Sequence, residues 1–261
     1  MLHGYAQSGS HFRWKTAGLM RRVRHVFPNA TFFWPDGPIE LKTSDISAWD
    51  HKSYSAECED GPELRAWFHL RYVVDPPPGL STSLSMIANI LQAEGPFDGV
   101  IAFSQGTLIA GMTASLLEGS VPHNADSEMR PNSPIAFQYP TAFLDIQHPP
   151  FKFGILYASR VGQHQCYDWL YENPGIRTPF CLVFGRLDPM IDCEERDAAS
   201  RQLTRGNGSC FWFHNGGHYV PTDALNVDRV IDFILRMSSL QALDTGSRTF
   251  NKHEPTFDVA D

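Results

Sequence analysis

Two patterns of apolar residues alternate along the chain. Short apolar runs bounded by turn residues are typical of buried strands, and longer stretches carry apolar residues at helical spacing. Such alternation predicts an α/β domain with a mostly parallel sheet flanked by crossover helices. The expected strands are 30–35, 99–103, 153–158, 180–184 and 209–213; the expected helices begin near residue 81 or 83 and span 105–117 and 227–237.

Length and composition set the expected domain organisation. With 261 residues, 42% of them hydrophobic and 19% charged, the chain can form one large core, and residues 1–243 are expected to make a single domain. Residues 118–150 are rich in Pro, Asn, Asp and Ser, which is typical of a lid or specificity loop and also of a surface insertion. Residues 244–261 are polar and unpatterned, so a flexible C-terminal tail is expected.

Charge and cysteine usage narrow the partners. A formal net charge of −8 without a basic stripe argues against a nucleic-acid or anionic-membrane partner. Five scattered cysteines without a C-x-x-C pair argue against a zinc ribbon or a disulfide framework and fit a reducing compartment. The chain shows no signal-peptide-like or membrane-spanning run, so a cytoplasmic location is expected. No metal-ligand spacing such as H-E-x-x-H occurs, and neither a metal nor a cofactor is expected.

The sharpest chemical feature lies where the expected strand 99–103 runs into an expected helix. Ser104 has a small residue two positions before it, Ala102, and another two positions after it, Gly106. This is the pattern of a nucleophile elbow, a strained turn that exposes a serine hydroxyl above the carboxyl edge of the sheet. Ala102 stands where the usual motif has glycine. The sequence therefore predicts Ser104 as the nucleophile of an acyl-transfer reaction.

Two later loops supply the predicted acid and base. Asp188 follows the fourth expected strand; Asp192 competes for the same role, and either could instead cap the next helix. Asp188 is preferred because it is nearest to the strand end. His218 follows the last strand behind a pair of glycines, with His214 as its rival. The order serine, aspartate, histidine is the order that the α/β-hydrolase fold requires.

A glycine-containing loop near the start of the chain, residues 3–9, is expected to contribute to an oxyanion hole. In this fold one donor is the backbone N–H after the nucleophile and a second comes from an early loop, which assigns the donors to Gln105 and Tyr5. The spacings of phosphate-binding loops are absent here. His3 is expected to make structural hydrogen bonds and not to act as a base.

Several segments together resemble the fungal serine hydrolase family, which includes an ovarian-cancer-associated hydrolase and fungal polyketide-cluster hydrolases and thioesterases. The resemblance implies the α/β-hydrolase fold and a cytosolic ester or thioester hydrolase without a cofactor, with Ser104, Asp188 and His218 as its triad. In the family several apolar residues precede L-H-G, whereas here Met1 does, so the first strand is expected to be clipped. The likeness is carried by residues 2–9, 65–68, 95–100, 103–106 and 216–221.

The expected reaction is two-step hydrolysis of a small-molecule carboxylic ester or thioester, in line with a role in fungal secondary metabolism. One alternative is a thioesterase that releases a polyketide or fatty acyl chain from an acyl carrier domain, because the same triad would serve. Another is a non-catalytic binding protein of the same fold, which would not need the three side chains together. Trp67, Phe68 and Tyr219 could line an apolar acyl pocket or belong to the core. The oligomeric state is left open.

Overall fold

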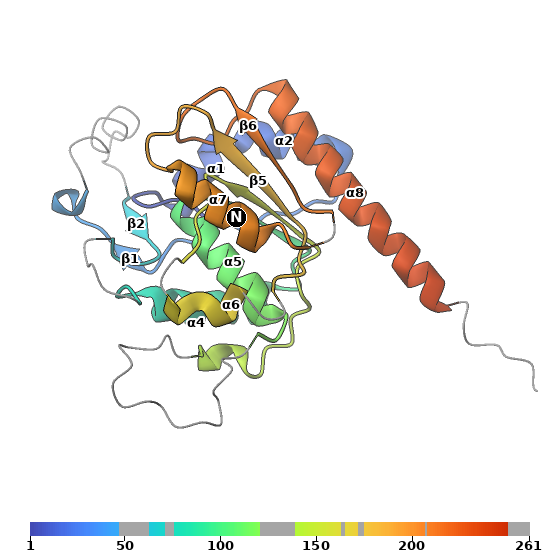
Figure 1. The fold of residues 1–261 in the computed structure, drawn as a ribbon, viewed down its shortest axis with the longest axis horizontal. Helices are drawn as coiled ribbons and strands as arrows, with labels where there is room; N and C mark the ends of the chain where they lie inside the picture. Colours follow the sequence, from blue (N-terminus) through green and yellow to red (C-terminus); the bar gives the residue numbers. More distant parts are fainter. Residues whose placement is uncertain are drawn as a thin grey trace, which may run out of the picture.

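A parallel four-stranded sheet lies at the centre of the described part of the computed structural model (Figure 1). The strands follow the order β3-β4-β5-β6, so each is hydrogen-bonded to the next one in the chain. Their bounds are β3 Gly99–Phe103, β4 Phe153–Tyr157, β5 Phe180–Gly185 and β6 Cys210–His214. The structure describes residues 1–46, 63–70, 76–120, 139–162, 165–171, 175–206 and 208–249.

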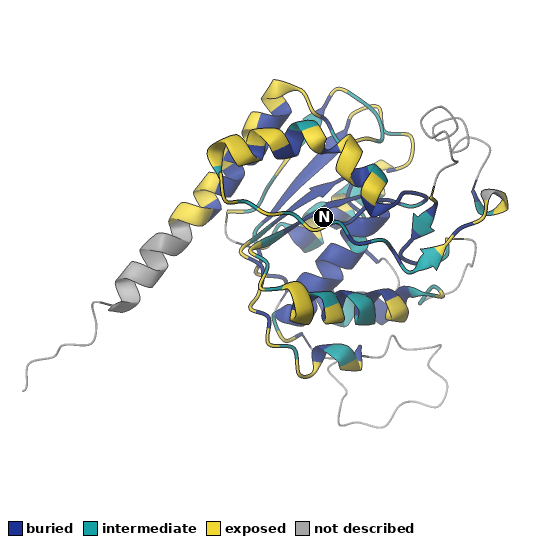
Figure 2. Cartoon of the chain, turned by 180° about the vertical axis from the view of Figure 1, so that it is seen from behind, coloured by how far each residue is buried: buried dark blue, intermediate teal, exposed yellow. Residues whose placement is uncertain are grey.

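The two faces of this sheet are covered by different helices, because successive strand residues point to opposite sides. On one face Ala102, Leu156 and Leu182 pack in a core with α4 (Leu80–Glu94), α5 (Gln105–Leu117), α6 (Asp168–Tyr171) and α7 (Cys193–Leu203). On the other face Ile101, Ile155 and Val183 pack with α1 (Gly9–Lys15), α2 (Ala17–Val26) and α8 (Ala224–Thr249). Figure 2 shows the buried sheet between helices; α1, α2, α4 and α8 have exposed outer surfaces, whereas α5 is almost entirely buried.

Smaller elements lie at the side of the sheet (Figure 1). Two short strands, β1 (Ile39–Glu40) and β2 (Arg65–Ala66), pair antiparallel, and Gln7 makes a bridge to Arg65. Three 3-10 turns complete the described elements: η1 Thr43–Asp45, η2 Thr141–Phe143 and η3 Gln165–Tyr167.

The N-terminal strand is reduced to a single bridge. Leu2 pairs in parallel with Ala102 and is hydrogen-bonded to the two residues that flank Ala102 in β3. Its N–H donates to Ile101 O (2.8 Å), and its carbonyl accepts from Phe103 N–H (3.0 Å). This agrees with the clipped first strand expected from the sequence. The bridge suffices to bring residues 3–7 to the end of β3, where Ser104 lies.

The prediction of a strand over residues 30–35 is wrong. This segment carries no regular secondary structure. The N-terminus contacts it through a hydrogen bond from the Met1 amino group to Phe33 O (2.9 Å). Apolar residues alone do not make a strand, because a strand also needs a partner that continues the ladder. Here Met1 lies beside the segment and bonds to it, whereas Leu2 pairs with Ala102 of β3.

The other expected elements are present, with small changes at their ends except in the C-terminal helix, which is much longer than expected. The strand after Pro150 ends at Tyr157, β5 includes Gly185, and β6 begins at Cys210. The C-terminal helix begins and ends beyond its expected bounds and continues past residue 243 to Thr249. Most of the segment 118–150 that the sequence predicts as a lid lies outside the described residues, as do residues 250–261. The division into one domain and a tail stays a prediction. No helix in the described ranges is both long and apolar enough to cross a membrane.

Candidate active site

Ser104 occupies a strained backbone position between β3 and α5. Its φ of 50° and ψ of −119° place a non-glycine residue at positive φ, which costs free energy and is maintained where the surroundings fix the turn. Ser104 N–H donates to Tyr157 O on β4 (2.9 Å), and its carbonyl accepts from Thr107 N–H (2.9 Å). These bonds join the turn to the neighbouring strand and to the first turn of α5. The side chain therefore projects from a fixed strand-to-helix corner.

The two small residues flanking Ser104 differ in how strictly their size is required. A Cβ at Gly106 would lie 2.6 Å from the carbonyl oxygens of both Leu2 and His3, so only glycine lets α5 approach the N-terminal bridge this closely. Ala102 is completely buried and its methyl group is accommodated in the core. The replacement of the first glycine of the motif by Ala102 is thus compatible with the turn.

A continuous hydrogen-bond chain connects the three predicted triad residues. His218 Nδ1 lies 2.8 Å from Asp188 Oδ2, and His218 Nε2 lies 2.9 Å from Ser104 Oγ. The Asp188 side chain is 2% exposed and that of His218 is 17% exposed, so the acid is enclosed while the base reaches towards solvent. The imidazole also packs against Phe103, with ring centroids 4.9 Å apart. The structure brings all three residues together.

The surroundings of Asp188 keep it ionised. Burial acts to raise the pKa of this carboxyl, but its hydrogen bond and charge interaction with His218 and the bonds from Met190 and Ile191 N–H outweigh burial and lower the pKa. Met190 N–H donates to Asp188 Oδ1 at 2.8 Å. An ionised Asp188 accepts a hydrogen bond from His218 Nδ1–H, which leaves Nε2 with its lone pair towards the Ser104 hydroxyl.

Backbone contacts fix the acid loop against the base loop. Arg186 N–H donates to His214 O (2.9 Å) and Leu187 N–H donates to Gly216 O (3.0 Å). A Cβ at Gly185 would lie 2.3 Å from Gly217 O, which shows how closely the end of β5 approaches the residues just before His218. The distance between acid and base is therefore set by main-chain packing.

Arg160 supports the acid loop from the other side, a contact that sequence reasoning missed. Its guanidinium donates to Met190 O and forms an ion pair with Glu195 (3.1 Å), while its backbone N–H donates to Thr107 Oγ1 (3.1 Å). The sequence signal is only an arginine in the loop after β4, outside any motif. Arg160 thus connects the loop carrying Asp188 with α5 and α7.

The two rival residues have structural roles. Asp192 is the N-cap of α7, where its side chain accepts from Glu195 N–H (2.8 Å) in a capping box. His214 is buried, accepts from Gly216 N–H at Nδ1 (3.2 Å) and packs edge-on against Tyr219. Burial lowers the pKa of His214. Asp188 and His218, which the sequence favours, are the residues hydrogen-bonded in series to Ser104.

The early loop, residues 3–9, passes directly beside Ser104. A Cβ at Gly4 would lie 3.3 Å from the Ser104 Cβ, and Gly4 N–H donates to Gln7 Oε1 (3.1 Å). His3 Nδ1–H donates to Gly4 O (2.7 Å), and Nε2 accepts from Gly37 N–H (2.8 Å). His3 therefore fixes the peptide unit between residues 4 and 5, whose N–H is the predicted Tyr5 donor. That donor role stays a prediction.

His3 performs this positioning as a neutral imidazole. Burial lowers its pKa to about 4, against a smaller opposing effect of the hydrogen bond to Gly4 O. The Trp67 indole donates to His3 O (2.8 Å), and the two rings stack with centroids 4.9 Å apart. These bonds agree with the structural role expected for His3.

Trp67 and Phe68 do not line an open pocket, which corrects the predicted substrate contacts. Trp67 is fully buried and Phe68 is 5% exposed, and both belong to the core beside α4 and α5. The Gln105 side chain holds them there: Oε1 accepts from Trp67 N–H (2.9 Å) and Nε2 donates to Phe68 O (2.8 Å). Burying these backbone groups requires such partners, and Gln105 supplies both.

Tyr219, the third predicted pocket residue, is half exposed directly after His218. Its hydroxyl end lies where a Cβ of Gly216 would be, so the ring covers the turn before the histidine. A substrate contact by Tyr219 stays a prediction. Among the described residues no group of three or more His, Cys, Asp or Glu side chains is arranged to hold a metal ion.

The class of the protein follows from this arrangement. Ser104, Asp188 and His218 follow β3, β5 and β6 at the carboxyl edge of a parallel sheet, which is the architecture of an α/β hydrolase. The family model described as "Serine hydrolase (FSH1)" matches residues 1–230, and the chain belongs to this family. This confirms the family resemblance and the fold class expected from the sequence.

The individual relatives share less than a third of their aligned residues with this chain. The chain is 28% identical over 237 residues to a protein named dihydrofolate reductase from Schizosaccharomyces pombe and 26% identical over 247 residues to esterase OVCA2 from Danio rerio. These alignments cover 89% and 90% of this chain, but 46% and 95% of the respective relatives. The chain thus spans about half the length of the first relative. Among solved structures, acyl-protein thioesterase 2 from Zea mays superposes with a TM-score of 0.53 at 16% identity, covering 90% of this chain and 91% of that one, which shows a shared fold.

Proposed function

We propose that this chain hydrolyses carboxylic esters or thioesters through an acyl-enzyme on Ser104. The observation that carries the proposal is the chain from Asp188 through His218 to Ser104, with distances of 2.8 Å and 2.9 Å. Both distances are within the range needed for proton transfer along a nucleophile–base–acid triad. A protein that only bound a ligand would not require a strained serine joined to an enclosed carboxylate through histidine.

In the proposed first step, His218 Nε2 takes the hydroxyl proton as Ser104 Oγ attacks the substrate carbonyl carbon. The developing oxyanion accepts hydrogen bonds from the backbone N–H groups of Tyr5 and Gln105. The protonated His218, stabilised by Asp188, then gives its proton to the leaving alkoxide or thiolate. In the second step His218 activates water, which attacks the acyl carbonyl and releases the acid and free Ser104.

An apolar acyl or leaving group suits the surroundings of the site. Leu187, Met190 and Tyr219 belong to the loops that carry the acid and the base, and all three are exposed large apolar side chains. Exposed apolar groups beside a reactive centre favour a ligand with an apolar portion. The cytoplasm is the proposed location, since Cys181, Cys193 and Cys210 are free thiols. A place in fungal secondary metabolism rests on the family resemblance alone.

The direct test is intact-mass labelling with a fluorophosphonate probe followed by peptide mapping. Wild type is expected to gain one adduct, on Ser104, which is lost in Ser104→Ala and strongly slowed in His218→Ala. Ser81→Ala and His25→Ala change exposed residues on α4 and α2 and serve as matched controls that should label like wild type. A folded wild type that is not labelled would overturn the proposal.

A second measurement separates the substrate classes. The rates on p-nitrophenyl esters of increasing acyl length are compared with those on the corresponding acyl-pantetheine thioesters. Preference for thioesters would favour release of an acyl chain from a carrier domain, and preference for esters a small-molecule esterase. Ser104→Ala should lose either activity by several orders of magnitude.

A further inference from the structure

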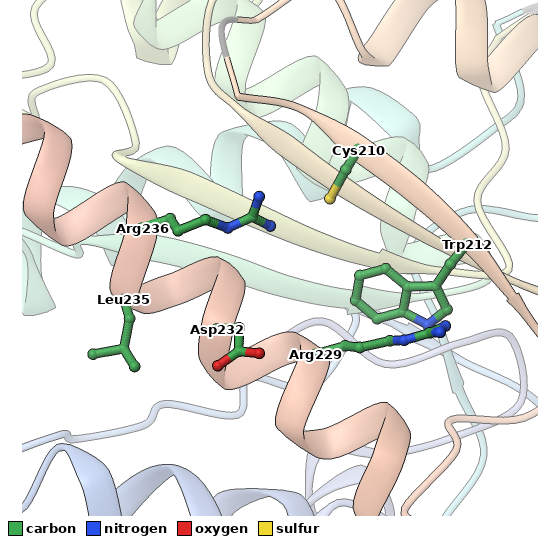
Figure 3. Close-up of a pocket in the computed structure, with 6 residues that line it drawn as sticks. All are labelled: Cys210, Trp212, Arg229, Asp232, Leu235 and Arg236. Atoms are coloured by element: carbon green, nitrogen blue, oxygen red, sulfur yellow. The ribbon is translucent and has the colours of Figure 1, made fainter.

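A groove far from the triad contains a thiol among charged side chains. It lies between β6 and α8, with a volume of about 520 Å³. The groove is at the start of β6, whereas His218 follows the end of that strand. Its lining residues, shown in Figure 3, are Cys210, Trp212, Arg229, Asp232, Leu235 and Arg236.

Cys210 is directly paired with a second cysteine. In the parallel ladder between β5 and β6, Cys181 lies opposite Cys210, so the two side chains project from the same face of the sheet. Adjacent strands lie about 4.8 Å apart, within the range of Cα separations of about 4.4–6.8 Å that disulfides span. Both cysteines are free thiols, with Cys181 fully buried and Cys210 partly exposed. One thiol of the pair is thus accessible and the other lies behind it.

The surroundings of the two thiols shift their pKa values in opposite directions. The hydrogen bond from the Cys181 thiol, together with the charge and hydrogen bond of Arg236, lowers the pKa of Cys210 to about 7 against the opposing effect of burial. Burial, followed by the interaction with Cys210, raises the pKa of Cys181. Figure 3 shows the Arg236 guanidinium and the Cys210 sulfur directed towards each other across the groove. Arg229 and Asp232, also on α8, are the other charged groups that line it.

We propose that Cys210 is an oxidation site for hydrogen peroxide and that Cys181 is its resolving partner, the two forming a disulfide between β5 and β6. The Cys210 thiolate attacks one peroxide oxygen, the O–O bond breaks, and the departing hydroxide takes a proton to become water. Sulfur is oxidised to a sulfenic acid and peroxide is reduced. Cys181 sulfur then attacks Cys210 sulfur: the S–S bond forms, the S–O bond breaks, and the leaving hydroxide takes the Cys181 proton.

The test treats the full chain at pH 7 with hydrogen peroxide and maps all five cysteines by non-reducing peptide mass spectrometry. We expect a cross-linked peptide pair containing residues 181 and 210. In Cys181→Ser the sulfenic acid should persist and give a dimedone adduct on Cys210. Cys193, exposed on α7, is the internal comparison and should react at least about tenfold more slowly than Cys210. Labelling of Cys210 with iodoacetamide should have its pH midpoint near 7 and shift upwards in Arg236→Met.

Three results would overturn this inference. They are a disulfide involving Cys58, Cys166 or Cys193 in place of the 181–210 pair, faster oxidation of Cys193 than of Cys210, and absence of the dimedone adduct in a folded Cys181→Ser variant. Circular dichroism establishes the fold of each variant. Since the readout is cysteine chemistry, it is independent of whether Ser104 is catalytic.

Discussion

Replacing Gly185 by alanine should disturb catalysis through the backbone that precedes His218. A Cβ at this position would lie 2.3 Å from Gly217 O and 2.6 Å from Gly216 O, whereas ordinary contact begins at 3.4 Å. Gly185 is not among the residues with positive φ, so alanine meets no conformational penalty there and the effect is steric. The 216–217 backbone must therefore retreat by about 1 Å, and His218 is covalently attached to it.

A displacement of this size is large compared with the tolerance of the proton-transfer geometry. His218 Nε2 is 2.9 Å from Ser104 Oγ, and a misplacement of about 1 Å in a catalytic group typically costs about 100-fold in rate. That corresponds to about 2.7 kcal/mol of transition-state stabilisation. The cost in folding stability from one methyl group forced into a packed site is about 1–3 kcal/mol, so the variant should still fold.

The assay measures kcat/KM on a p-nitrophenyl ester together with urea unfolding of the same preparations. Gly18→Ala is the matched control, because nothing lies within 4 Å of a Cβ at this position in α2. It should keep wild-type activity and gain about 0.5–1 kcal/mol of stability. A folded Gly185→Ala variant with kcat/KM within about threefold of wild type would refute the idea that this close approach positions the base.

Three further substitutions test separate parts of the site. Asp188→Asn should lower kcat by about 10⁴ with little change in KM, because the amide favours the wrong histidine tautomer; steady-state kinetics at pH 8 checks this. His3→Gln should reduce the pH dependence of stability. A histidine with a folded pKa of about 4, below its unfolded value of 6.5, supplies stability above pH 6.5 that is lost as the pH falls to about 4, a difference of about 3 kcal/mol. Urea unfolding at pH 7 and pH 4 should show a smaller decrease in the variant than in wild type. Gln105→Ala leaves a buried donor and a buried acceptor of residues 67–68 unpaired and should cost about 2–5 kcal/mol, measured by urea unfolding.

The elements that the sequence predicts correctly are those whose signal is local. β3 and β5 are continuous apolar runs bounded by glycine or proline, and the helix after Ser104 begins and ends where its apolar pattern does. The sequence could single out Ser104, Asp188 and His218, which the structure places in one hydrogen-bonded chain, because each follows such a strand in the order the fold requires. The predictions fail where contacts with residues distant in the sequence determine the local structure. Residues 30–35 have strand composition without a ladder partner.

Trp67, which the sequence assigns to the site and the structure places in the core, illustrates the same limit. An aromatic residue near a motif is compatible with a pocket wall and with the core, and composition does not distinguish the two. What decides is the Gln105 side chain, 38 positions along the chain, which accepts from Trp67 N–H and holds the 67–68 backbone in the interior. The supporting role of Arg160 likewise depends on Met190 and Glu195, which the fold alone brings near it. Such contacts are tertiary and leave no periodic pattern in the sequence.

At three glycines, segments of the site approach each other more closely than a side chain would allow. Gly4 lies against the Phe103 ring and the Ser104 Cβ, Gly106 against the carbonyls of residues 2 and 3, and Gly185 against those of 216 and 217, so each of these glycines faces a different segment of the site. None of the three adopts positive φ, which means that they are needed for closeness and not for an unusual conformation. Positive φ is found instead at Ser104 itself, and also at Ala6 and Ala158. Alanine at any of the three positions should therefore separate two loops, and the effect on rate should depend on whether one of them carries Ser104 or His218.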